Sequence, residues 1–185
     1  TYHGPRQSEI SVNLAPHQEY YAGRTYHNFR HSIFGSVQAS PDVSVYLSVS
    51  AGENIDFTNA QPADFVTINP GGSFNIGRRI YGEIDYVWQR FDTESGQRIF
   101  TVHLPQAKLL YHFSRRAFVR TVLQYQTVDR VTEKSRELLT QLLFSYRWNA
   151  QTVVLAGYSD NYEGELDLSR TDRAVFVKLG YAWLF

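Results

Sequence analysis

The side chains best suited to chemistry in this sequence are charged and amide groups that recur at alternate positions of several segments. Glu83 and Asp85 stand in one such segment, and Arg120 with Gln124 in another. Inside a β-barrel of about eight to ten strands, such groups could line a pore, bind a solute, or pair off as a structural network. The network is the favoured interpretation. The complete predicted lumen-facing set is Glu83, Asp85, Arg120, Gln124, Glu137, Gln141, Arg147 and Lys178.

Histidine and serine could supply a second kind of chemistry. The chain has six histidines, and no spacing among them is typical of a metal site. A serine hydrolase acting on lipid would need a histidine base within hydrogen-bond reach of its nucleophile. His103 with Ser36 or Ser50 would provide those parts. The sequence does not show that reach, so we predict no catalytic residue, no cofactor and no metal.

The segment from Asp160 to Asp172 is rich in acidic residues. Oxygens from such side chains could bind Ca²⁺ or divalent ions that bridge lipopolysaccharide. The order of ligands in an EF-hand loop is absent, so a solvated surface loop is favoured. The candidate oxygen donors are Asp160, Asn161, Glu163, Glu165 and Asp167.

Alternation of apolar and polar residues predicts strands along most of the chain. No run approaches the roughly 18 apolar residues of a membrane helix, and no helical period is found. Two opposite apolar phases flank Pro105, so we expect a β-bulge there. The predicted strands lie near 7–14, 18–26, 29–39, 43–54, 65–77, 80–92, 97–113, 117–129, 136–148, 151–160 and 172–185.

The connections between these strands alternate between tight turns and longer polar stretches. Turns such as 40–42 and 78–79 alternate with predicted loops such as 56–64 and 161–170. Short turns on one side and longer loops on the other are typical of outer-membrane barrels. If the C-terminus is periplasmic, all the tight turns fall on the periplasmic side.

The last eleven residues indicate where the protein resides. Val175, Val177 and Leu179 share one strand face with the aromatic residues that follow them, which places an apolar, aromatic-tipped face towards lipid. Aromatic residues gather at both interfaces of a membrane protein. The predicted girdle and C-terminal assembly signal are Trp88, Trp148, Tyr181, Trp183 and Phe185.

Composition agrees with a barrel and excludes other classes. Aromatic residues make up 15% of the chain, with 13 Tyr and 12 Phe. Cysteine is absent, which excludes disulfides and thiolate metal sites. The formal net charge is zero, so nothing argues for nucleic acid. The chain opens on Thr1 without a charged and apolar leader, so we expect a mature form or a piece of something longer.

Three segments near the end, 111–129, 142–162 and 173–185, together resemble a known family in motif order and spacing. They are similar to the C-terminal β-barrel end of Gram-negative outer-membrane proteins that carry an N-terminal carbohydrate-binding-like domain of the family 9 type. The likeness covers about the last 80 residues. The N-terminal domain has no counterpart here, so the resemblance implies a barrel and no sugar site.

We therefore predict a single all-β domain over residues 1–185. It is an antiparallel transmembrane β-barrel of about 8–11 strands, or the C-terminal part of a larger barrel, in the bacterial outer membrane. The predicted function is a pore, an anchor or a scaffold for an envelope partner. The alternative is an envelope enzyme acting on lipid or glycan at the barrel mouth. The expected partners are membrane lipid, lipopolysaccharide, the barrel-assembly machinery and, if the first and last strands do not meet, another chain.

Overall fold

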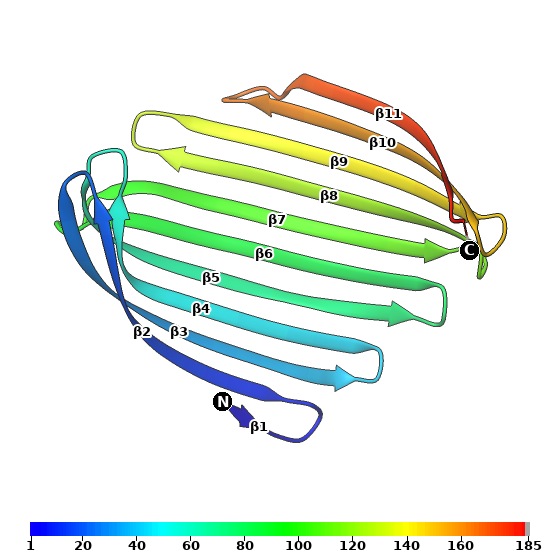
Figure 1. Cartoon of the computed structure of the whole chain (residues 1–185). Helices are drawn as coiled ribbons and strands as arrows, with labels where there is room; N and C mark the ends of the chain where they lie inside the picture. Colours follow the sequence, from blue (N-terminus) through cyan, green and yellow to red (C-terminus); the bar gives the residue numbers. More distant parts are fainter. Residues whose placement is uncertain (184–185) are drawn as a thin grey trace.

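Ten long strands and one short strand form a single curved antiparallel sheet in the computed structural model, which describes residues 1–183 (Figure 1). Each strand pairs with the next one along the chain, so sequence order and sheet order are identical. The all-β antiparallel prediction is confirmed. The strands are β1 (Tyr2–His3), β2 (Glu9–Tyr21), β3 (Arg24–Ser40), β4 (Val43–Asp56), β5 (Gln61–Ile76), β6 (Ile80–Thr93), β7 (Arg98–His112), β8 (Ala117–Arg130), β9 (Lys134–Arg147), β10 (Thr152–Gly164) and β11 (Ser169–Tyr181).

The sheet has two edges. At one edge β1 pairs with β2 only through Tyr2 and His3, which leaves most of β2 unpaired on that side. At the other edge β11 pairs with β10 from Tyr181 back to Ser169. Within residues 1–183 no pairing joins β11 to β1 or β2. The two edges lie apart in Figure 1, with β2 at the bottom and β11 at the top.

Burial is inverted relative to a water-soluble domain. Among the described residues only six hydrophobic side chains are buried, and three of them, Ala63, Phe65 and Phe91, form one small cluster. Many large apolar side chains are exposed instead, including Val177 at 74% and Ile84 at 59%. A contiguous apolar surface of this kind marks contact with a membrane or a protein partner. We also find, within residues 1–183, no helix with the length and apolar character needed to cross a membrane.

The first two predicted strands, 7–14 and 18–26, were divided in the wrong place. Residues 9–21 form one strand, and the reversal comes at Ala22 and Gly23, which both have positive φ. Two consecutive positive φ values are the geometry of a type I′ hairpin turn. Pro16 falls between the two predicted strands, yet it lies inside β2, which has one almost unpaired edge where a proline is tolerated.

The predicted difference in loop length is also wrong. The stretches 56–64 and 161–170 are mostly strand, and only residues 57–60 and 165–168 form the connections. These strand ends carry mostly polar side chains, because they lie beyond the apolar part of the outward-facing surface. That polarity removes the alternation from which strands are recognised, so the strand ends were predicted as loops.

The bulge predicted at Pro105 is absent. Tyr86 pairs with Pro105 without a register shift, and β7 is continuous. The apolar phase changes for a different reason. Phe100 stacks on Phe91 in the small cluster on one face of the sheet, whereas Leu109 is exposed on the other face.

Candidate functional site

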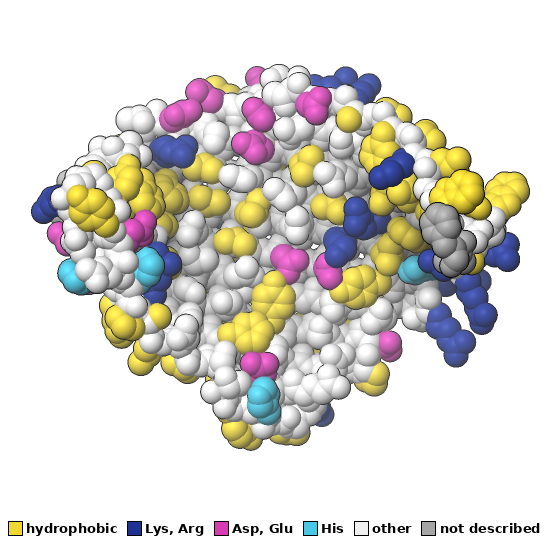
Figure 2. Space-filling model, in the orientation of Figure 1, with side chains coloured by type: hydrophobic (Ala, Val, Ile, Leu, Met, Phe, Trp, Pro, Cys, Tyr) yellow, Lys and Arg dark blue, Asp and Glu magenta, His cyan; other side chains and the backbone are white. Residues whose placement is uncertain are grey.

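All eight residues predicted to face a lumen share one face of the sheet. Register places Glu83 beside Lys108 and Asp85 beside Gln106, whose neighbour on β8 is Gln124. We name this polar side the inner face and the apolar side the outer face. Figure 2 looks onto the hollow inner side, where acidic and basic side chains gather near the middle. The register puts the following on the inner face: Glu83, Asp85, Arg120, Gln124, Glu137, Gln141, Arg147 and Lys178.

A hydrogen bond on the inner face spans three strands. Tyr46 on β4, Gly71 on β5 and Asp85 on β6 lie in one cross-strand row. Because Gly71 has no side chain, the Tyr46 ring lies over it, and its hydroxyl donates to Asp85 Oδ1. A ring packed over a glycine on the adjacent strand helps to pin the register of a curved sheet.

Glu83 is held by two neighbours on the same face. Lys108 Nζ lies 2.7 Å from Glu83 Oε2, and the Tyr81 hydroxyl donates to Oε1. One strand further on, Gln106 Nε2 donates to Gln124 Oε1 at 2.9 Å. The inner side chains from β4 to β8 therefore form bonded groups in which both acids have partners. This agrees with the network interpretation for that part of the set.

The rest of the inner face is more basic and more open. Arg120, Arg147 and Lys178, on β8, β9 and β11, are all exposed. Within residues 1–183 no ion pair involves any of these three side chains. Two acidic groups, Glu83 and Asp85, thus lie on β6 in the middle of the sheet, whereas Glu137 and the three accessible cations lie on β8 to β11.

Aromatic pairs mark one end of the outer face. Tyr146 and Trp148 meet edge to face, as do Tyr181 and Trp183. The first residue of β10, Thr152, lies between these two pairs. It pairs with Tyr181 in register, and the Thr152 carbonyl accepts a hydrogen bond from the Trp148 amide. Trp148 and Trp183 are 66% and 76% exposed. Phe185 lies outside the described residues.

The other end of the outer face carries a second aromatic group. Trp88 pairs with His103 in register, and Tyr158 lies opposite Val175. From Tyr181 to Arg173 the outer face of β11 runs for nine residues, which agrees with the roughly 9–11 residues that a tilted membrane strand needs. A membrane-girdle role for these aromatic residues remains a prediction.

The serine and histidine combination considered from sequence is not assembled. His103 lies on the outer face, where its Nδ1 is 2.6 Å from the Tyr86 hydroxyl. Ser36 and Ser50 lie on the inner face of β3 and β4. At least two strands and the thickness of the sheet separate His103 from both serines, so His103 cannot act as their base.

The predicted acidic loop is likewise not a single cluster. Asp160 points to the outer face, whereas Asn161 and Glu163 of the same strand, β10, point to the inner face. Successive residues of a strand point to opposite faces, which disperses oxygens that seem close in sequence. Among the described residues no group of three His, Cys, Asp or Glu side chains could hold a metal ion.

A cavity of about 510 Å³ opens among the strand ends near the 57–60 loop. Ile55, Phe91 and Phe100 form its apolar part, while Asp56 and Arg98 add charge. Its described lining contains no histidine, so it offers space for a small solute without a general base of that type.

Comparisons with known proteins give the fold. No family model matches the chain, and no curated protein matches it. Two solved structures of OmpT, an outer-membrane protein of Vibrio cholerae, are similar to it. The in-vitro folded trimer form has a TM-score of 0.61 at 12% identity, and the outer-membrane expressed form has 0.58 at 14%. Each comparison covers 85% of this chain and 57% of the OmpT chain.

The chain therefore has the all-β antiparallel fold of an outer-membrane β-barrel protein and spans little more than half the length of OmpT. The location predicted from the sequence agrees with that resemblance. Nothing in these comparisons supports a carbohydrate-binding domain.

Proposed function

We propose that this sheet forms the wall of a porin-like pore in the bacterial outer membrane, with the inner face lining the path of small solutes. The observation that carries the proposal is the division between the two faces. Exposed apolar side chains cover the outer face, and charged or amide side chains occupy the inner face. That division is typical of a channel in lipid.

The proposed pore favours anions. Lys108 neutralises Glu83, and the other two carboxylates among the eight inner-face residues, Asp85 and Glu137, are outnumbered by the exposed cations Arg120, Arg147 and Lys178. A unit charge about 8 Å from a passing ion changes its energy by roughly 0.5 kcal/mol in water, or about twofold in local concentration. Each exposed cation therefore raises the local chloride concentration and lowers that of potassium by about that factor at low salt, so their ratio changes about fourfold.

Planar-bilayer conductance under a salt gradient tests this proposal. We expect channels whose reversal potential indicates an anion preference. The chloride-to-potassium selectivity ratio should fall about fourfold for Arg120→Gln and again for Lys178→Gln. Arg90→Gln is the control, since Arg90 pairs with Asp92 on the outer face. Inserted protein that gives no conductance, or equal shifts in all three variants, would contradict the proposed lining.

The unpaired edges have a consequence for assembly. Backbone groups without partners are not tolerated in the hydrocarbon region, so an open sheet edge cannot face lipid. We propose that further strands, from another polypeptide segment, pair with β2 and β11 to close the ring. The structural comparison covers only 57% of the OmpT chain, which supports closure of the ring by further strands.

Closure is tested by gel mobility with and without heating, together with native mass in detergent. We expect a stable, heat-shifted species whose native mass exceeds that of one 185-residue chain, because a second polypeptide, such as a second copy of this chain, completes the ring. A heat-shifted monomer with the mass of one 185-residue chain would show that these strands close on themselves.

The remaining parts of the proposal concern the surroundings. Phospholipid and lipopolysaccharide contact the outer face, and the barrel-assembly machinery recognises the final strand. A relationship to envelope barrels that follow a carbohydrate-binding-like domain also stays a prediction. The supporting residues are those of the three segments near the end of the chain that carry the resemblance, 111–129, 142–162 and 173–185.

A further inference from the structure

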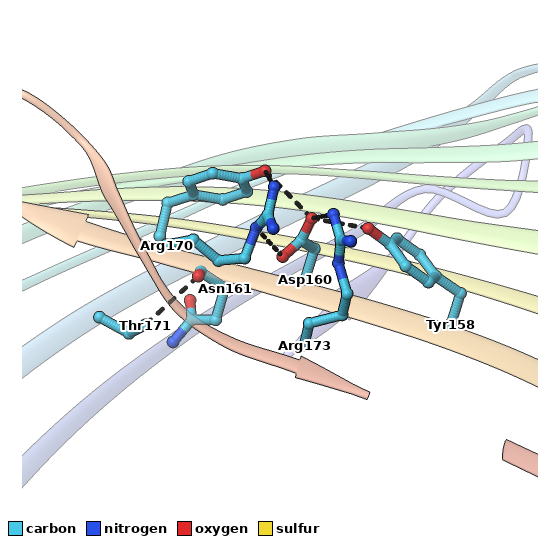
Figure 3. Close-up of polar contacts among 7 residues, drawn as sticks. Tyr158, Asp160, Asn161, Arg170, Thr171 and Arg173 are labelled. Carbon is cyan, nitrogen blue, oxygen red and sulfur yellow. Dashed lines mark hydrogen bonds and ion pairs between the residues drawn. The ribbon is translucent and has the colours of Figure 1, made fainter. Parts of the chain in front are cut away.

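One buried carboxylate on the outer face has two arginine partners that the sequence analysis did not connect with it. Asp160 is only 7% exposed in its side chain. Arg170 Nε lies 3.2 Å from Asp160 Oδ1, and Arg173 lies 3.4 Å from Oδ2. Tyr158 and Tyr162 both donate to Oδ2, at 2.6 and 3.0 Å (Figure 3).

A bulge makes this arrangement possible. Residues three apart in a regular strand point to opposite faces, so Arg170 and Arg173 would normally diverge. The register shifts here: Asn161 pairs with Asp172, but Tyr162 pairs with Arg170. The extra residue, Thr171, is bonded through its hydroxyl to the Asn161 carbonyl (Figure 3). Both arginines therefore reach the same carboxylate.

The two guanidinium groups are held in place but remain accessible. Each lies over a tyrosine ring, Arg170 over Tyr162 at 5.6 Å and Arg173 over Tyr158 at 5.7 Å. Their side chains are 46% and 48% exposed. Asp160 balances only one of the two positive charges. The cluster thus carries a net positive charge on partly exposed guanidinium groups.

Its position along the strands favours one class of ligand. On β11 the outer residues Leu179, Val177 and Val175 are 68–74% exposed, and Arg173 comes next. An acyl chain lying on the three apolar residues would bring its headgroup to the arginines. Paired guanidiniums suit phosphate oxygens in particular, because their planar donors match that geometry.

We propose that Arg170 and Arg173 bind the phosphate of a membrane lipid, with Asp160 as a positioning residue. This inference rests on the proposed insertion of the outer face into a membrane. It deepens that proposal by assigning a headgroup site beside β11. The site lies at the strand ends near the 165–168 loop, on the same end as Trp88 and Tyr158.

Native mass spectrometry of the detergent-solubilised 185-residue protein tests the site. The probes are bis-phosphorylated lipid A, phosphatidylglycerol, phosphatidylcholine and inorganic phosphate. We expect retention of lipid A, weaker retention of phosphatidylglycerol, and none of inorganic phosphate alone. One surface arginine is worth about fivefold in affinity for an anionic lipid, so Arg170→Gln and Arg173→Gln should each lose roughly that much.

Asp160→Asn separates a built site from simple charge attraction. Removing a negative charge would strengthen non-specific binding of an anion. If Asp160 positions the two arginines, the same change weakens lipid A retention. Arg90→Gln is the matched control, because Arg90 is 44% exposed on the outer face and has its own partner, Asp92.

Three results would overturn the inference: stronger lipid A retention in Asp160→Asn, equal loss in Arg90→Gln, or equal binding of inorganic phosphate by the wild type. Each variant is first checked for insertion into lipid vesicles by protection from protease. A wild type that does not insert refutes the proposed function. Insertion without arginine-dependent lipid retention refutes only this site.

Discussion

Replacing Gly71 by alanine tests whether the inner hydrogen-bond network fixes the middle of the sheet. A Cβ at this position would lie 2.5 Å from the Tyr46 hydroxyl and from Asp85 Oδ1. Ordinary carbon contacts need about 3.5 Å, so those groups must move by roughly 1 Å. The bond between Tyr46 and Asp85 cannot survive that movement, and a bond to a charged acceptor contributes about 1.5–3 kcal/mol.

We therefore expect Gly71→Ala to lower the free energy of unfolding by about 2–3 kcal/mol. The measurement is urea unfolding of the protein in lipid vesicles, followed by tryptophan fluorescence. Gly35→Ala is the control, since a Cβ on Gly35 would meet nothing closer than 3.9 Å. Alanine restricts the unfolded chain, so this change should cost less than about 0.5 kcal/mol or be stabilising.

A double variant sharpens the test. Tyr46→Phe keeps the ring over Gly71 but removes the hydroxyl. If Gly71→Ala acts by breaking the same bond, the two changes together should cost clearly less than their sum. The reasoning is refuted if Gly71→Ala unfolds at the same urea concentration as wild type, or if the two costs add.

Three further outcomes are expected. Gly52→Ala should prevent folding of the β3–β4 hairpin, because Gly52 has φ of 146° and a Cβ there would overlap the Phe29 carbonyl. On an unheated gel this variant should give no folded species. Burial favours the neutral form of Asp56, but hydrogen bonds from Asn59 and nearby groups outweigh it and lower the pKa of that carboxyl. The ionised Asp56 carboxylate therefore adds to the free energy of unfolding above its unfolded-state pKa, and this contribution is lost as pH falls. The unfolding curves of wild type and Asp56→Asn should then converge below about pH 4. Changing Tyr181 and Trp183 to Ser should reduce insertion into vesicles, measured as protease protection, since the final strand loses aromatic residues from its outer face; unchanged insertion would refute that orientation.

The strands could be predicted from the sequence where the outer face is apolar, because a strand with lipid on one side alternates strictly between apolar and polar residues. Leu138, Leu142 and Phe144 alternate with Glu137 and Gln141, and the structure separates the two groups onto opposite faces. The same reasoning failed where that constraint ends. Beyond the apolar part of the outer face the side chains are mostly polar, so the strand ends at 56 and 161–164 carried no periodic signal.

Local proline signals were also misleading when they were interpreted alone. Pro105 suggested a bulge, and Pro16 falls where the first two predicted strands were separated, yet both prolines lie inside continuous strands. Register shifts occur elsewhere in the sheet, and one of them lies at Thr171, where no proline marks it. Whether a proline interrupts a strand depends on which neighbour its missing N–H would have bonded, and that is a property of the assembled sheet.

By itself the sequence determined the all-β architecture and the assignment of side chains to two faces, since a period of two is a local property of the backbone. Only the tertiary structure decided which side chains meet. It brought Tyr46 to Asp85 across Gly71, placed His103 on the opposite face from Ser36 and Ser50, and left two edges unpaired. Those relations depend on strand register and sheet curvature, which link residues far apart in the chain.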